Sequence, residues 1–408
     1  MFNLWKFNQL RISLLSLSIS LGFLLFASSG CELLPIAIPT ATPTATPGIT
    51  VCAVGCDFST IQAAIDAEST QAGDIIGLND EVHTEAGVQV TKDIILQGRG
   101  AETTIVQANA NPDEANERVF FITSGVTVTI RGMTIRHGNP DTDPESGGGV
   151  INQGTLTLDE VIVSDNKGSA GGGILNEGIL TLLNSTVKGN TAKGGGNPLI
   201  ECDTGGGIKI MTGRVTLINS TISSNTARGK GGGVHVACKG VLVLINSTIS
   251  GNYTNNYGGG VYLNGVGEFT HSTISGNNAN SGGGITFSGS GEKGQIQGQL
   301  NYTNTIIAGN TARLEKYGVA DCLLGDLGTI AVNSNNWVGD GNCSASYSGD
   351  PLLGPLADNG GATQTQALLA GSPAIDALQT EYCTLQTDQR GEPRGEPCDL
   401  GAYESQSK

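Results

Sequence analysis

The stretch Gly231-Gly232-Gly233-Val234-His235-Val236, followed by Leu242-Val243-Leu244-Ile245 and Asn246-Ser247-Thr248-Ile249-Ser250-Gly251-Asn252, decides the fold. Apolar residues stand at every second position, which is the period of a strand with one buried face. Gly and Asn separate the segments, and both residues tolerate the backbone conformations of sharp turns. The stretch therefore predicts three short strands joined by tight corners.

This pattern is repeated along the middle of the chain. Gly triplets begin at positions 147, 171, 205, 231, 258 and 282, at intervals of 24 to 34 residues. Such a period is typical of a solenoid, in which each repeat forms one turn. Because a parallel crossover between strands is right-handed, the repeats predict an all-β right-handed parallel β-helix.

The composition fits a stack of identical turns. The 408 residues include 62 Gly, only 14% are charged, and the formal net charge is −16. Turns about 4.8 Å apart bring equivalent residues into columns, where like charges repel. One Asn recurs at equivalent corners and predicts an internal amide ladder: Asn166, Asn190, Asn225, Asn252, Asn277 and Asn310. The acidic balance without basic runs excludes a nucleic-acid partner.

Polar triplets recur in the same register. Asn-Ser-Thr begins at positions 184, 219 and 246 and matches a glycosylation sequon each time. Because the triplets follow the repeat, we expect a structural ladder instead of glycan attachment.

The N-terminus predicts export. Lys6 and Arg11 precede an uncharged run, 12–26, which has the length of a signal-peptide core. The following Ala-Ser-Ser-Gly-Cys at 27–31 resembles a bacterial lipobox, which implies that Cys31 carries the lipid; the alternative is ordinary cleavage that leaves Cys31 as a spare thiol. We expect a signal peptide at 1–30, then the lipidated Cys and a Pro/Thr linker at 31–50. The predicted location is a membrane-anchored lipoprotein at the cell surface or facing the periplasm.

The remaining cysteines are even in number, as expected for disulfides in an exported chain. Proximity favours Cys52–Cys56, Cys322–Cys343 and Cys383–Cys398, with Cys202–Cys238 left over, although eight cysteines allow 105 pairings. No Cys-x-x-Cys pair occurs and the four His are scattered, so we expect no metal site.

The repeat region, taken as 51–313, resembles right-handed parallel β-helix proteins of the pectin-lyase-like kind. Its start, Phe58-Ser59-Thr60-Ile61-Gln62-Ala63-Ala64-Ile65-Asp66-Ala67 before Gly73-Asp74-Ile75-Ile76, looks like the short helix and first strand of such solenoids. This helix is expected to cover the open apolar end.

The C-terminal segment, taken as 314–408, carries a second set of motifs. These are Asp350-Pro351-Leu352-Leu353-Gly354-Pro355, Gly371-Ser372-Pro373-Ala374-Ile375-Asp376, Thr387-Asp388-Gln389-Arg390-Gly391 and Cys398-Asp399-Leu400-Gly401-Ala402-Tyr403-Glu404. Together they resemble the choice-of-anchor Q domain of bacterial surface proteins. Gln366 stands where that family often has His. The resemblance implies a tethered β-helix, and we expect the tether here to be Cys31. The cysteine pairs favoured above predict that this C-terminal segment is disulfide-stapled.

Catalytic motifs of β-helical enzymes are sparse. The sequence has no Asp-Asp and no Gly-His-Gly, and Arg136-His137-Gly138 lacks the carboxylate pair needed for glycoside hydrolysis. Asp159, Glu160 and Asp165 lie on one turn, which alone makes no Ca²⁺ nest. We expect no cofactor, with Ca²⁺ required only if the protein is a lyase.

One outward column offers candidate chemistry. If the central residue of each first strand points outward, Lys209, His235 and Tyr262 stack on consecutive turns. They would supply a base, an acid/base group and a stacking ring for a saccharide cleft, with Tyr253 and Tyr257 in a nearby corner. The alternative, which we favour, is an ordinary solvated wall with apolar neighbours that the insert 192–204 could shield.

Two function classes follow. The first is a non-catalytic surface lipoprotein whose β-helix is a binding, adhesive or structural scaffold, with carbohydrate as a ligand class. The second is a polysaccharide lyase or glycoside hydrolase acting on an outer wall. The missing motifs favour the first, and the Lys209–His235–Tyr262 column favours the second.

Overall fold

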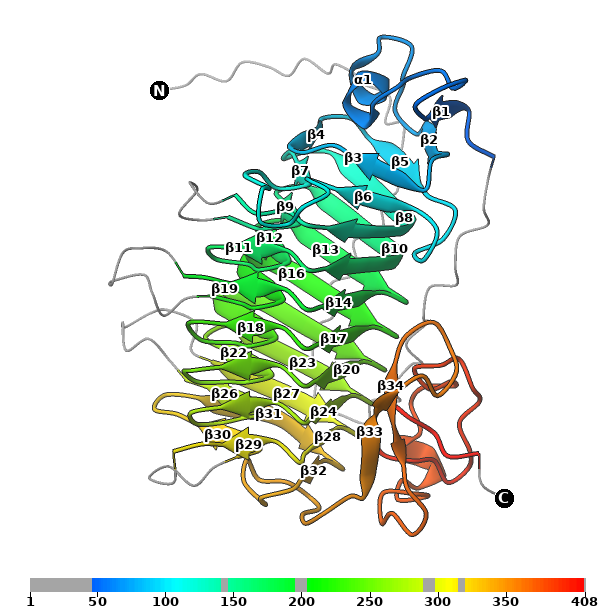
Figure 1. The fold of residues 1–408 in the computed structure, drawn as a ribbon. Coiled ribbons are helices and arrows are strands. Elements are labelled where there is room, and N and C mark those ends of the chain that lie inside the picture. Colours follow the sequence, from blue (N-terminus) through cyan, green and yellow to red (C-terminus); the bar gives the residue numbers. More distant parts are fainter. Residues whose placement is uncertain (1–45, 141–145, 195–203, 289–297, 315–319, 407–408) are drawn as a thin grey trace, which may run out of the picture. The chain divides into compact units, whose positions relative to one another are not determined.

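The computed structural model describes residues 46–140, 146–194, 204–288, 298–314 and 320–406 (Figure 1). The expected signal peptide, Cys31 and most of the Pro/Thr linker lie outside these residues. In the described part of the chain, no helix has the length and apolar character that crossing a membrane requires.

The described residues form a right-handed parallel β-helix, as predicted. Each strand pairs in parallel with its equivalent one turn later, so Val150 aligns with Ile174, Ile208, Val234 and Val261. Gly and Asn corners separate the strands, and this spacing fixes which side chains point inward.

The N-terminal turns contain α1 (Ile61–Asp66) and eight strands: β1 (Ile49–Val51), β2 (Ile75–Leu78), β3 (Val82–Thr84), β4 (Val88–Val90), β5 (Ile94–Gln97), β6 (Ile105–Gln107), β7 (Phe120–Ile122) and β8 (Thr127–Arg136). In the later turns, the first stack begins in β9 (Val150–Asn152), β12 (Ile174–Asn176), β16 (Ile208–Ile218), β19 (Val234–Ile245), β22 (Val261–Leu263), β26 (Ile285–Phe287) and β30 (Cys322–Leu324).

The second and third stacks contain β10 (Thr155–Ser164), β13 (Ile179–Leu183), β14 (Thr186–Lys188), β17 (Thr221–Ser223), β20 (Thr248–Ser250), β23 (Val266–Thr270), β24 (Thr273–Ser275), β27 (Gln299–Thr303), β28 (Ile306–Ala308), β31 (Thr329–Ser334) and β32 (Trp337–Val338). A separate stack of two-residue strands contains β11 (Lys167–Gly168), β15 (Thr191–Ala192), β18 (Thr226–Ala227), β21 (Tyr253–Thr254), β25 (Asn278–Ala279) and β29 (Thr311–Ala312). The antiparallel pair β33 (Leu353–Ala357) and β34 (Thr365–Leu368) and the 3-10 helix η2 (Thr380–Tyr382) follow.

The N-terminal helix caps the apolar end, as predicted. Thr60 is the N-cap, and its hydroxyl accepts a hydrogen bond from the Ala63 amide at 3.2 Å. The Glu85 carboxylate accepts further hydrogen bonds from the Ile61 and Gln62 amides. Ile61, Ala64 and Ile65 are buried against the first turns, so the cap is shorter than its sequence pattern but covers the core.

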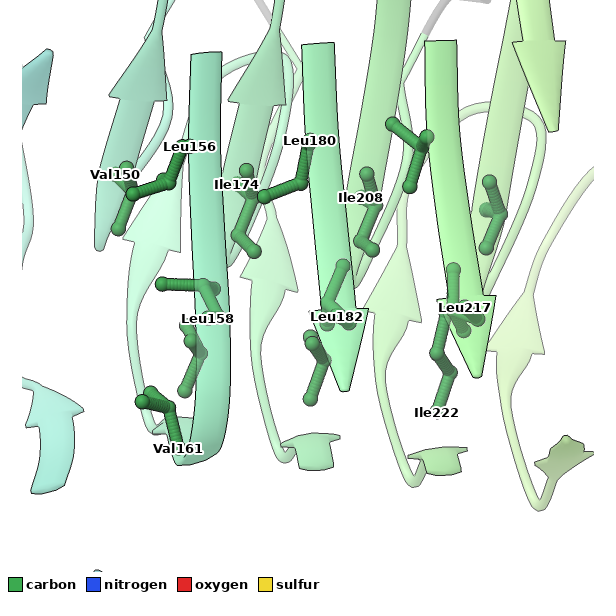
Figure 2. Packing of buried hydrophobic residues seen from close by; sticks show 14 of the residues in the cluster. Val150, Leu156, Leu158, Val161, Ile174, Leu180, Leu182, Ile208, Leu217 and Ile222 are labelled. Atoms are coloured by element: carbon green, nitrogen blue, oxygen red, sulfur yellow. The ribbon is translucent and has the colours of Figure 1, made fainter. Parts of the chain in front are cut away.

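Columns of aliphatic side chains fill the interior (Figure 2). Leu156 aligns with Leu180 and Val215, and Leu158 aligns with Leu182 and Leu217. Burying one such side chain is worth roughly 1.5–3 kcal/mol, so every turn adds its own share of stability.

The predicted amide ladder is confirmed. Each Asn side chain donates from Nδ2 to Oδ1 of the next at 2.9–3.0 Å, from Asn166 through to Asn310. Asp321 ends the ladder, because its Oδ1 accepts from both the backbone and the side chain of Asn310.

The Asn-Ser-Thr triplets form a second ladder, as expected, and its members are the Ser residues. The Ser185 amide donates to Ser220 Oγ, and the Ser220 amide donates to Ser247 Oγ. Asn184, Asn219 and Asn246 instead occupy left-handed backbone positions at the corner, which Asn tolerates better than most residues.

The Gly triplets are required by close approach between turns. A Cβ on Gly206 would lie 2.0 Å from the Gly232 carbonyl oxygen and 2.7 Å from the Thr226 carbonyl carbon. Only a residue without a side chain fits between these backbones.

The parallel stack extends to Val338, one turn beyond the boundary at residue 313 that the motifs indicated. Three of the expected disulfides are present: Cys52–Cys56, Cys322–Cys343 and Cys383–Cys398. Cys202 and the side chain of Cys238 lie outside the described part of the structure.

Candidate functional site

The candidate column has the predicted register. Lys209 aligns with His235, and His235 aligns with Tyr262, as the central residues of the first strand in three successive turns. Lys209 Nζ lies 2.9 Å from His235 Nδ1, and the His235 and Tyr262 rings meet edge to face with their centroids 5.3 Å apart. The Lys230 ammonium lies 4.7 Å from the centre of the Tyr262 ring. The structure thus brings all three predicted side chains together.

The column is not a solvated wall. Lys209, His235 and Tyr262 are only 1%, 0% and 5% exposed. The Gly segment before one of these strands lies close to the column, since a Cβ on Gly258 would be 2.9 Å from Tyr262 Cβ. The expectation of exposure is wrong, because the alternating pattern shows which side chains point away from the core but not what packs over them.

Burial also determines the charge state of the column. Desolvation, together with the neighbouring charges of Lys209 and Lys230, lowers the pKa of His235 well below its usual value. The imidazole is therefore neutral at pH 7, and its Nδ1 accepts a hydrogen bond from the Lys209 ammonium group.

The C-terminal motif residues bind the β-helix itself. The Gln389 side chain donates to Thr221 Oγ1 at 2.9 Å and accepts from Thr248 Oγ1 at 2.6 Å. The Ala402 amide donates to Thr273 Oγ1 at 3.0 Å. These three Thr are aligned on the outer face of β17, β20 and β24, so the C-terminal region covers one wall of the helix.

A buried ionic network holds the motifs together. The Asp388 carboxylate pairs with Arg390 at 2.8 Å, and the Arg394 guanidinium pairs with the Glu404 carboxylate at 3.2 Å. Arg394 also donates to Asn246 Oδ1 at 3.0 Å and to the Gly401 carbonyl. The charged residues of the motif therefore have structural partners.

Gln366 has a structural contact as well. Its Nε2 donates to the Gly354 carbonyl oxygen at 3.2 Å, which links β34 to β33. The side-chain amide of Gln366 therefore supports the local structure.

The corner tyrosines differ from one another. The Arg313 guanidinium lies 4.7 Å from the Tyr253 ring centre and donates to the Tyr253 hydroxyl. Tyr257 is 36% exposed. In the described residues, no three His, Cys, Asp or Glu side chains are grouped so that they could hold a metal ion.

No protein-family model matches this sequence, and no curated protein matches it. Solved structures do match. Pectate lyase Pel9A is 15% identical with a TM-score of 0.46, over 82% of this chain and 89% of that chain. Pectin methylesterase from carrot is 14% identical with a TM-score of 0.34, over 71% and 85%. The PL6 family alginate lyase AlyGC is 13% identical with a TM-score of 0.30, over 85% and 58%. These likenesses concern the β-helical fold alone.

Proposed function

We propose that this protein is an exported surface scaffold that binds carbohydrate without cleaving it. The burial of Lys209, His235 and Tyr262 supports this proposal most directly. A general base must reach the proton that it removes to within hydrogen-bond distance, and a polysaccharide does not reach side chains that are buried to this extent.

The C-terminal region has a matching role in this proposal. We propose that it is a choice-of-anchor Q domain whose buried charges serve to fasten it to the β-helix. Gln389, Arg394 and Glu404 are buried and bonded, which favours rigidity over chemistry. A rigid scaffold presents a ligand surface at low entropic cost.

The tether proposed for this scaffold is a lipid on Cys31. Its support is the sequence 27–31 after a signal-like run and the Pro-rich spacer that follows. Metabolic labelling with palmitate should mark the wild-type protein and not a Cys31→Ala variant. A soluble, unlabelled wild-type product would overturn the anchor.

A polysaccharide lyase or glycoside hydrolase is the second candidate. The contact between Lys209 Nζ and a neutral His235 imidazole favours it, because such a pair can move protons.

One experiment separates the two functions. The purified protein is incubated with polygalacturonate, alginate and glycosaminoglycans, with and without Ca²⁺, and both retention on the immobilised glycan and product release are measured. The scaffold predicts retention without products. Unsaturated products that disappear in a His235→Ala variant would overturn it in favour of the lyase.

A further inference from the structure

A pocket lies on the outer face of the third stack, away from the buried column. Its cavity volume is about 420 Å³, within the range of small-molecule sites. Its lining combines apolar residues with six polar or charged side chains: Arg99, Glu102, Thr103, Glu160, Asn184 and Thr186.

A single column of residues defines the width of this pocket. Thr134, Ile162, Thr186 and Thr221 align on successive turns. Thr134 and Thr221 are covered, whereas Ile162 and Thr186 between them are part of the pocket lining. Three steps between turns of about 4.8 Å give about 14 Å between the covered positions.

Both walls of the pocket are fixed to that column. The Thr134 hydroxyl donates to the Ala101 carbonyl at 2.7 Å and holds the 99–103 loop. On the other side, the Thr221 hydroxyl donates to the Gln364 carbonyl at 2.7 Å. The C-terminal loop held in this way contributes Ala362 to the lining. A pocket with two fixed walls is organised before its ligand arrives.

The charge of the pocket is negative. Glu102 and Glu160 face a cavity whose lining has Arg99 as its cationic side chain. Behind it, Asp159 and Arg131 are register partners on neighbouring turns, so their charges offset one another. The net charge of −16 on the whole chain adds to the attraction for a cation.

Glu160 differs from the Asn residues that occupy the equivalent corner position in the next turns. Its φ is 53°, in the left-handed region, where the next turns have Asn184, Asn219 and Asn246. Asn adopts this conformation more readily than Glu, so the carboxylate is kept at a conformational cost. Strained residues of this kind are concentrated at functional sites.

We propose that this pocket binds an amino-sugar unit of a glycan, with the ammonium group held between Glu102 and Glu160. The inference rests on the proposed carbohydrate-binding role and adds the ligand class and the place. The hydroxyls of Thr103 and Thr186 and the Asn184 amide supply donors and acceptors for ring hydroxyls. Polyuronates and sulfated glycans are disfavoured at this pocket, because their anions meet two carboxylates, so retention of those glycans on the scaffold would involve another part of its surface.

The test uses glucosamine oligomers as the probe and titration calorimetry on the full chain. Wild-type protein should bind them, more weakly at high salt, and N-acetylated oligomers should bind at least about tenfold more weakly, because they lack the ammonium group. A Glu160→Asn variant should lose at least about tenfold in affinity while it unfolds at the same or a higher temperature. Glu268→Gln, which removes an exposed carboxylate paired with Arg214, should leave binding unchanged.

The outcomes distinguish this inference from the proposed function. Glycan binding that is unaffected by Glu160→Asn would contradict this pocket as the binding site and would leave the proposed carbohydrate-binding scaffold unaffected. Equal binding of spermidine would overturn the sugar as ligand in favour of a simple amine. The absence of binding to any glycan tested would overturn both proposals.

Discussion

At the scale of single residues, the C-terminal region depends on charges that are removed from water. The side chains of Arg394 and Glu404 are 1% and 4% exposed, and Arg394 bonds to Asn246 of the β-helix. Burying two charges is costly, and the cost is offset only when each charge keeps its partner. Such a pair makes the docking geometry sensitive to small changes.

Removing one member of this pair should therefore be severe. We expect Arg394→Met to lower the free energy of unfolding by about 3–5 kcal/mol, because Glu404 then stays buried without its counter-ion. Urea denaturation followed by circular dichroism measures the change. The matched control is Arg214→Met, at the exposed pair with Glu268, where about 0–1 kcal/mol is expected. Equal losses at the two sites would contradict this account.

His271 should make stability sensitive to acid. It is buried in the corner below Asn246, and burial together with the nearby Arg394 charge lowers its pKa well below the usual value. As the pH falls below about 6.5, the unfolded chain binds a proton at His271 that the folded chain does not, so the free energy of unfolding decreases.

A His271→Asn variant isolates this effect. Asn stands at the same corner in neighbouring turns and suits the left-handed backbone of position 271. Stability of the variant relative to wild type should rise as the pH is lowered from 7 to 5, as measured by thermal unfolding. Burial raises the pKa of Asp399 and of Glu404, which act in the opposite direction but are present in both proteins. A difference that is constant with pH would exclude His271 as the source.

At the scale of elements, the ladders hold successive turns in one register. Asn225 Nδ2 donates to the Val187 carbonyl and to Asn252 Oδ1, while its Oδ1 accepts from the amide and side chain of Asn190. Each bond joins one turn to the next, so an error at one corner leaves unpaired groups on two turns.

We expect Asn225→Ala to destabilise the protein by about 2–4 kcal/mol, since it leaves several buried polar groups without partners. The control is Asn301→Ala on the half-buried outer face of β27, where a change within about 0.5 kcal/mol is expected. Denaturant midpoints compare the two. A small effect at Asn225 would mean that water replaces the ladder bonds.

The strands and the amide ladder were the features of this structure that the sequence predicted best. The alternation of apolar residues predicts the strands, and the Asn at 166, 190, 225 and 252 predicts the amide ladder, because both signals are local and periodic. The Ser185–Ser220–Ser247 ladder carries the same periodic signal, which predicts a ladder in the triplets without naming the residue that forms it. The sequence does not show which polar residue of a triplet points inward.

For the candidate site, the sequence predicted which residues align on successive turns but not whether they are buried. The alignment of Lys209, His235 and Tyr262 follows from the period of the repeat. Their burial does not follow from that period. The docking of Gln389 on Thr221 joins residues 168 apart, and no local pattern contains such a contact. The pocket beside Glu160 depends on the same long-range docking.

At the scale of the whole domain, the C-terminal region is a separate layer on one wall. Leu385 is buried against Leu183, Ile218, Val243 and Ile245, which point outward from the β-helix. The β-helix has its own continuous core. We therefore expect the C-terminal layer to open without unfolding the turns beneath it.

Removing the Cys383–Cys398 disulfide tests this separation. A Cys383→Ser/Cys398→Ser variant frees a loop of sequence separation 15, which costs about 3 kcal/mol in the chain-entropy account. Hydrogen exchange should lose protection in residues 350–406 and keep it in β16 and β19. Uniform loss across both regions would show instead that they unfold as one cooperative unit.

Thr134, Ile162, Thr186 and Thr221 align on successive turns, so the number of turns also sets the distance between the two walls of the pocket. Single turns vary from 24 to 34 residues without changing the spacing of the stack, whereas a complete added turn changes the distance between the two pocket walls by about 4.8 Å. Duplication of the turn that contains Asn190 would widen the pocket by one increment and leave both walls intact. Duplication below Thr221 would instead separate the partners of Gln389. A change in the number of turns between the two walls can therefore change the size of ligand that the pocket accepts, while contacts elsewhere in the molecule stay the same.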